Sequence, residues 1–141
     1  MKWIVAWAAV AALGSTAGAE TAKPPVGDGY TATAAFVAAG PGAGKIAVVI
    51  AIAEPYHWNA EYPAKLEVDG ALPATVEAPQ RIVKAKEAGF QVSPQKVTAE
   101  LPVVVKGARG GEVAMTAKFS ICSAELCLMK TAKLKAWAGP R

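Results

Sequence analysis

Apolar and polar residues alternate in short stretches along most of the chain, and glycine or proline separates one stretch from the next. Stretches of this kind that are rich in β-branched residues are typical of strands in an all-β domain. Alanine is plentiful and favours helix, but the alternation and the turn signals outweigh its propensity. The pattern therefore predicts an all-β fold, an immunoglobulin-like β-sandwich. The expected strands lie within residues 30–38, 45–53, 65–70, 97–107, 113–122 and 127–137.

The pattern predicts the structure of three further segments with different clarity. Residues 45–53 (KIAVVIAIA) are apolar on both faces, which is typical of a strand in the centre of a sheet. Residues 54–63 (EPYHWNAEYP) are rich in aromatic residues and predict a loop. Residues 71–96 carry no clear period, so a short strand, an irregular loop and a single helical turn all remain open there.

The N-terminus predicts export. Lys2 precedes an unbroken apolar run at 3–13, and small residues follow, with Ala17 and Ala19 in the positions of a signal-peptidase site. The run is shorter than the ~20 apolar residues that span a bilayer. The expected organisation is a signal peptide at 1–19, a flexible Pro/Gly-rich N-terminus at 20–29 and one sandwich domain at 30–141.

Composition and charge narrow the classes of partner. The chain has 15 Lys+Arg and 11 Asp+Glu residues, and removing residues 1–19, with their one lysine, leaves 14 against 11, a net charge of +3. The basic residues are dispersed rather than gathered into a patch interleaved with aromatic residues, so we expect no nucleic-acid partner. No second apolar segment is long enough to cross a bilayer, so we expect no membrane insertion of the mature chain.

The only two cysteines, Cys122 and Cys127, flank a four-residue loop between the last two expected strands. This loop would place them opposite each other, where Cα atoms of antiparallel strands lie ~4.5–5.5 Å apart, within the range that a disulfide accepts. Alternation puts both cysteines on the polar, outward faces of their strands, together with lysines 118, 133 and 135. We therefore expect an exposed disulfide at the tip of a hairpin.

Such a disulfide fits two classes of function. As a structural bridge, a ring of about six residues adds only ~2 kcal/mol of stability, against ~4.7 kcal/mol for a loop of a hundred residues. As a working bridge, an outward disulfide is open to attack by a thiolate, and the neighbouring lysines favour the thiolate form. A passive binding module with a structural disulfide and a thiol:disulfide exchanger both remain open, and the outward placement favours the exchanger.

Three segments resemble the family of N-terminal periplasmic domains of the thiol:disulfide interchange protein DsbD, together with its small stand-alone relatives. The segments are 99–107 (AELPVVVKG), 114–127 (AMTAKFSICSAELC) and, more loosely, 55–68 (PYHWNAEYPAKLEV). The cysteine spacing is one residue shorter than in the best-known members of that family. No thioredoxin-like or transmembrane domain follows, so we expect any electron donor to be a separate protein.

The resemblance implies an immunoglobulin-like sandwich in the periplasm, without a cofactor, whose catalytic pair Cys122 and Cys127 relays two electrons. It implies a thioredoxin-like protein or a transmembrane electron carrier as donor, and a periplasmic thiol protein as client. In the family an aromatic cap shields the redox pair. The matching residue in this sequence would be Phe90.

His57, the only histidine, lies in the aromatic loop with Tyr56, Trp58 and Tyr62. One interpretation is a partly exposed polar side chain without a special role. The other is that this loop lies near the cysteines and helps to dock a partner, because aromatic side chains anchor interfaces.

Copper carriage is a third function that the residues suggest, since thiolate, thioether and imidazole ligands suit Cu(I). The ligands would come from both cysteines, His57, Met115 and Met129. Alternation places Met115 in the core, however, and the spacing matches no recognised metal motif, so we expect no metal site. The hydrolase motifs G-x-S-x-G and H-E-x-x-H are absent.

Overall fold

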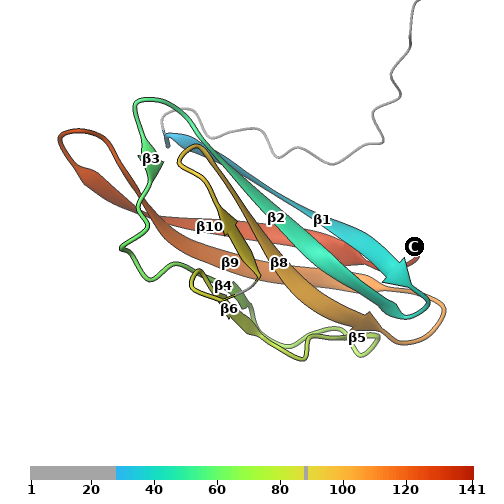
Figure 1. Cartoon of the computed structure of the whole chain (residues 1–141). Coiled ribbons are helices and arrows are strands. Elements are labelled where there is room, and N and C mark those ends of the chain that lie inside the picture. The colour runs from blue at the N-terminus through green and yellow to red at the C-terminus, as the bar shows by residue number, and fades with distance from the viewer. Residues whose placement is uncertain (1–27, 88) are drawn as a thin grey trace, which may run out of the picture.

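Two antiparallel β-sheets pack face to face in the computed structural model, which describes residues 28–87 and 89–141 (Figure 1). Ten strands make up the secondary structure of these residues, with no helix among them. The predicted immunoglobulin-like β-sandwich is confirmed. The predicted signal peptide at 1–19, and residues 20–27 of the predicted flexible N-terminus, lie outside the described residues. No helix of the two described ranges is long and apolar enough to span a membrane.

The first sheet is built on three long strands in the order β1 (Tyr30–Gly40), β2 (Ala43–Ile52) and β8 (Lys96–Val105). Two short strands, β5 (Val76–Glu77) and β7 (Phe90–Val92), pair with the other side of β8. The segment predicted to form a central strand is β2, which pairs with β1 on one side and β8 on the other. That prediction is confirmed.

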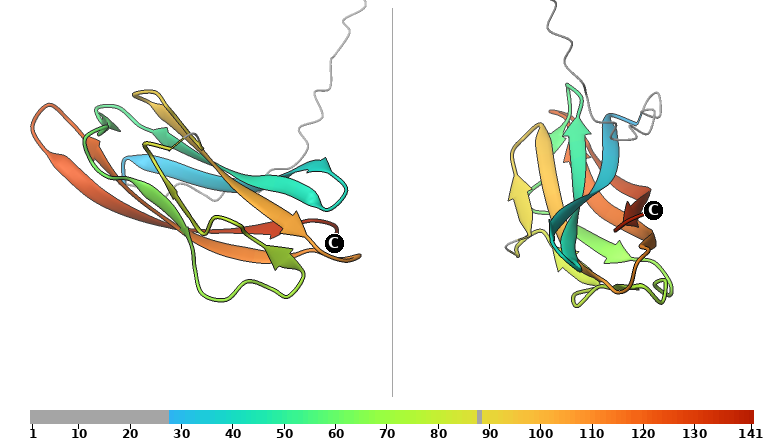
Figure 2. Two further views of the ribbon diagram at one scale, coloured as in Figure 1. Left: turned by 60° about the horizontal axis from the view of Figure 1, so that its bottom comes forward. Right: turned by 90° about the vertical axis from the view of Figure 1, so that its right-hand side faces the viewer.

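The second sheet has the order β10 (Cys127–Ala138), β9 (Gly111–Cys122), β4 (Lys65–Val68) and β6 (Ile82–Lys84). A two-residue strand, β3 (His57–Trp58), pairs with the end of β9 on the same side as β4. The β9–β10 hairpin extends beyond the other strands at one end of the sandwich (Figure 2).

The segment 71–96, which the sequence left open, has three very short strands among its described residues, divided between the two sheets, and its last residue begins β8. β5 and β7 belong to the first sheet and β6 to the second, so the chain crosses between the sheets repeatedly here. Strands of two or three residues are too short for alternation to reveal them, and pairing with β8 and β4 is what makes them strands.

Alternation along the long strands supplies the core, because every second side chain points into the space between the sheets. Phe119 lies at the cysteine end of this core. Its ring and the ring of Tyr30 are perpendicular with 5.0 Å between centroids, and Trp58 stacks on it at 5.5 Å with 14° between the ring planes. The largest fully buried side chains are Phe119, Ile46, Ile50, Leu66, Leu101, Met115, Ile121, Val48, Val83, Val97, Val113 and Ser120.

Tyr30 predicts a specific loss of stability at alkaline pH. Burial raises the pKa of its phenol above the ordinary value of 10.0, and the Asp28 carboxylate adds to this rise. Above about pH 10 the unfolded state therefore binds fewer protons than the folded state, and the free energy of unfolding falls as the pH rises through the folded-state pKa. In urea titrations we expect Tyr30→Phe, which keeps the ring on Phe119, to show a shallower decline above pH 10. Identical declines in the two proteins would contradict the assignment.

Candidate functional site at the tip of the cysteine hairpin

The two cysteines close the β9–β10 hairpin. Cys122 is the last residue of β9 and Cys127 the first of β10, and the register pairs them directly. They form a disulfide with an S–S distance of 2.04 Å and a Cα–Cα distance of 4.0 Å. The predicted opposition of the two cysteines across a hairpin is confirmed, although their Cα atoms lie closer together than the expected ~4.5–5.5 Å.

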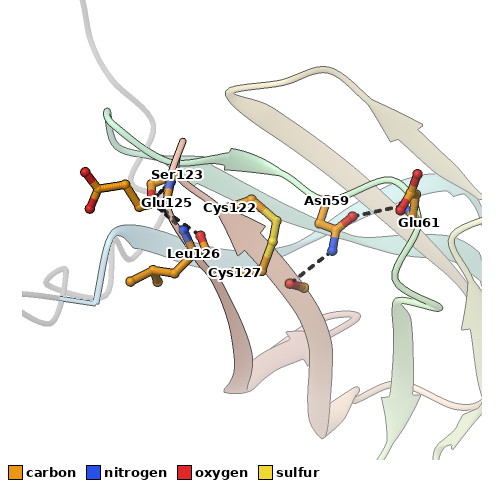
Figure 3. The surroundings of a disulfide bond; sticks show 8 residues. Asn59, Glu61, Cys122, Ser123, Glu125, Leu126 and Cys127 are labelled. Atoms are coloured by element: carbon orange, nitrogen blue, oxygen red, sulfur yellow. Dashed lines mark hydrogen bonds between the residues drawn. A yellow bond between two sulfur atoms is a disulfide. The ribbon is translucent and has the colours of Figure 1, made fainter.

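The loop between the cysteines is held by Ser123 (Figure 3). Its backbone N–H donates to the carbonyl oxygen of Leu126 at 2.8 Å. Its hydroxyl oxygen accepts hydrogen bonds from the backbone N–H groups of Glu125 at 3.3 Å and Leu126 at 3.2 Å. The loop therefore has its own hydrogen-bonded turn, and the hairpin does not depend on the disulfide to close.

The two sulfur-bearing residues differ in exposure, which corrects the prediction that both are exposed. Both lie on the outer face of the second sheet, but Cys122 is only 8% exposed, whereas Cys127 is exposed. The reason is that β9 has a strand on each side at this point, with His57 of β3 paired opposite Cys122. Cys127 lies on β10, the edge strand of the sheet.

β3 presents its two residues to opposite faces of the sheet. His57 is exposed and shares the outer face with Cys122, its direct cross-strand neighbour, and side chains so paired have Cβ atoms ~4.5–5.5 Å apart. Trp58 pairs with Ile121 and is only 5% exposed, stacked on Phe119 in the core. The row Cys127, Cys122 and His57 thus runs across three adjacent strands of one face.

Hydrogen bonds on both sides fix the position of β3. The Trp58 N–H donates to the carbonyl of Pro94 at 2.8 Å, and the Asn59 N–H donates to the carbonyl of Ser120 at 2.9 Å. The Gln95 side-chain amide donates to the carbonyl of Tyr56 at 3.0 Å. The histidine is therefore carried beside Cys122 by a segment attached both to β9 and to the turn that begins β8.

Asn59 and Ser120 are residues of this site that the sequence interpretation missed. The Asn59 side-chain amide donates to the hydroxyl of buried Ser120 at 3.4 Å, and its oxygen accepts from the Glu61 N–H at 3.1 Å (Figure 3). Because Ser120 alternates with the core residue Phe119, the sequence predicts an exposed polar side chain at this position. Its burial becomes evident only from its contact with Asn59, which is distant in the sequence.

The structure places the predicted docking and cap residues in different parts of the sandwich. Trp58 is a core residue and offers no docking surface, because it is buried. Tyr56 and Tyr62 are half-buried and pack against the core. Phe90 pairs with buried Ala99 in the first sheet and packs against the core from there, so it does not cover the disulfide on the outer face of the second sheet.

Two exposed apolar side chains lie beside Cys127. Leu126, which precedes it in the loop, is 48% exposed, and Met129, two residues further along the same face of β10, is 79% exposed. Met115, the other methionine of the copper hypothesis, is fully buried in the core. Within residues 28–87 and 89–141, no three His, Cys, Asp or Glu side chains come together as a metal site.

No family model matches this chain, and no curated protein matches it. Among solved structures, the chain is similar to the ASH/PapD-like domain 7 of human CEP192, with 11% identity over 80% of this chain and 87% of that one and a TM-score of 0.27. It is also similar to AggA, the major subunit of aggregative adherence fimbriae type I from Escherichia coli, with 8% identity over 78% of this chain and 93% of that one and a TM-score of 0.33. These similarities say nothing about the cysteine pair, so its function has to be inferred from the geometry of this chain.

Proposed function

We propose that this chain is an exported thiol:disulfide exchange protein that relays two electrons through Cys122 and Cys127. One observation carries the proposal: the disulfide joins two strands that are already paired, at the tip of a hairpin, with one of its residues exposed. A bridge in that place is reachable by another protein's thiolate. The sandwich gains little from it, because the ring it closes is short.

The difference in exposure supports one order of events. A partner thiolate attacks the Sγ of Cys127, the S–S bond breaks, and its electron pair remains on the Sγ of Cys122. A second thiolate of the partner then attacks the partner's own sulfur in the mixed disulfide and releases Cys127. The partner dithiol is thereby oxidised to a disulfide, and the two cysteines take up two protons and are reduced. The reverse sequence passes the two electrons to an oxidised client.

His57 contacts the reacting sulfur in this proposal. When Cys122 leaves as a thiolate, the residue opposite it is a histidine, whose ring N–H can donate a hydrogen bond to the sulfur. Hydrogen bonds to charged groups are stronger than those between neutral groups. The imidazole would therefore stabilise the leaving thiolate and the reduced form of the pair.

The resemblance to the N-terminal periplasmic domains of DsbD supports the same proposal and extends it. It suggests the periplasm as the compartment, a thioredoxin-like protein or a transmembrane electron carrier as the donor, and a periplasmic thiol protein as the client. Leu126 and Met129 would supply apolar contacts to these partners on either side of Cys127. Of the residues predicted to dock a partner, only His57 is exposed. Tyr56 and Tyr62 would contribute only their exposed edges.

The test is the reduction potential of the Cys122–Cys127 pair, measured by thiol trapping of the folded protein in glutathione and dithiothreitol buffers. Working oxidoreductases lie at about −120 to −270 mV, and we expect a value in that range. A value well below about −300 mV, together with slow reduction of the folded protein, would mark a structural disulfide in a passive binding module.

The same titration tests His57. Losing one hydrogen bond to a thiolate destabilises the reduced form, so we expect the His57→Leu variant, whose side chain has no donor, to have a potential lower by about 30 mV or more. An unchanged potential would remove the role assigned to the imidazole and leave the exchange proposal in place.

A further inference from the structure

Three lysines lie side by side on the outer face of the second sheet. Lys65 of β4 pairs with Lys84 of β6 on one side and with Lys118 of β9 on the other. Directly paired residues of antiparallel strands share a face, so the three ammonium-bearing side chains form one row across three strands. We call Lys84, Lys65 and Lys118 the lysine row.

The carboxylates of the sheet pair with only one of the three lysines of the row. Lys65 has one carboxylate oxygen, from Glu67, at 3.4 Å. In the described part of the chain, Lys84 and Lys118 have none within 4.0 Å, and both are exposed. Like charges opposite each other destabilise a sheet. The arrangement therefore opposes stability, which makes a binding role the better explanation for it.

Two other lysines of this face form ion pairs with carboxylates. The unpaired positive charge of this face therefore lies in the row. Lys133 lies 3.7 Å from Asp69, and Lys135 lies 3.8 Å from Glu112. Both pairs are further from the disulfide than the row is. The positive excess on this face is thus closest to the reactive end of the hairpin.

The row has a fixed relation to the disulfide. Lys118 precedes Cys122 by four residues on β9, so both side chains point to the same face. At ~3.3 Å per residue, the row lies about 13 Å from the disulfide along the strand. Met129 occupies the intervening position on β10, paired with Ser120. A surface that reaches Cys127 across Met129 would also reach the row.

We propose that the lysine row binds an acidic patch on the partner thiol protein, placed about 13 Å from the partner's reacting cysteine. This inference rests on the proposed exchange function and adds the charge of the partner. Complementary charge brings partners together faster and fixes their orientation. The partner is a protein surface because the charges share one face with the disulfide and with an exposed apolar side chain between them.

The probes are three peptides with one cysteine each, Cys-Gly-Ser-Gly-Glu-Glu-Glu, Cys-Gly-Ser-Gly-Lys-Lys-Lys and Cys-Gly-Ser-Gly-Ser-Ser-Ser. Four extended residues span about 13 Å, so the charges reach the row when the cysteine reaches Cys127. We would measure the rate constant for reduction of the folded protein at about 0.01 M and about 0.5 M salt. At low salt the acidic peptide should react about tenfold faster than the basic one, and high salt should remove the difference.

Two double variants make the test specific. Lys84→Glu/Lys118→Glu should abolish or reverse the preference for the acidic peptide. Lys106→Glu/Arg109→Glu makes the same change in net charge in the turn between β8 and β9 and should keep the preference. Far-ultraviolet circular dichroism checks that both variants remain folded.

The outcomes separate this inference from the function on which it rests. If the neutral peptide reduces the wild-type protein but the acidic and basic peptides react equally, the lysine row has no part in docking and the exchange function stands. If no peptide reduces the folded protein, the exchange function itself falls, and this inference with it. If both double variants lose the preference alike, only net charge matters. If the row instead binds phosphatidylglycerol vesicles without any peptide preference, it is a lipid contact and the inference is overturned.

Discussion

The Cys122→Ser variant is expected to keep a fast-reacting thiol, and the Cys127→Ser variant is expected to carry a thiol that reacts at least about tenfold more slowly. Cys127 is exposed on the edge strand, whereas Cys122 is 8% exposed between β10 and β3. A thiol between two strands is reached by a reagent only when the surrounding structure opens. The measurement is the rate of alkylation of each folded variant by iodoacetamide at neutral pH.

The same two variants separate the two roles in exchange. Neither can complete a two-electron transfer, since each keeps only one of the two cysteine thiols, so reduction of a partner disulfide should be lost entirely in both. A mixed disulfide with an oxidised partner should accumulate only with Cys122→Ser, because the remaining Cys127 thiolate attacks a partner disulfide and displaces one partner thiolate. In denaturant both thiols should react at the same rate, which is the control for intrinsic reactivity. Equal alkylation rates in the folded variants would overturn the assignment of Cys127 as the residue attacked first.

Trp58→Ala should have the largest effect on stability, a loss of about 3–5 kcal/mol in the free energy of unfolding. The indole is 5% exposed and stacks on Phe119, and it is the inward anchor of a strand only two residues long. Removing it leaves a cavity at the cysteine end of the core. Urea denaturation followed by far-ultraviolet circular dichroism measures the loss.

Trp137→Ala is the matched control, because Trp137 is a half-buried tryptophan on β10 whose ring N–H donates to the carbonyl of Pro140. It should cost about 1 kcal/mol. Trp58→Ala should also speed alkylation of Cys122 in the Cys127→Ser background, because β3 would no longer be held beside β9. If the two tryptophan variants are equally stable, Trp58 does not anchor the strand.

The long strands were predictable because each has enough residues to display its own alternation. β1, β2, β8, β9 and β10 all lie where the sequence pattern placed them, within a few residues at each end. The short strands β3, β5, β6 and β7 were not predictable, since two or three residues have no measurable period. They exist because a long strand of distant sequence offers them backbone partners.

The candidate site also has one part that was predictable from the sequence and one part that was not. The disulfide was predictable because both cysteines flank one short loop, so their opposition is a local property of the hairpin. The burial of Cys122 was not predictable. It comes from pairing with His57, which lies 65 positions earlier in the chain and was assigned to a loop. The lysine row was also hidden, since dispersed lysines become neighbours only once the order of β6, β4 and β9 is known.

The short ring closed by the disulfide has a consequence for repeated use. Unfolding and reduction form a closed thermodynamic cycle, so the amount by which the disulfide stabilises the fold equals the amount by which folding lowers the potential of the disulfide. A ring this small contributes about 2 kcal/mol, which corresponds to about 45 mV for two electrons. The reduced protein thus keeps the same sandwich and is less stable than the oxidised protein by only this amount. Each turnover would leave the core closed, with no refolding step between acceptance and delivery of the electron pair.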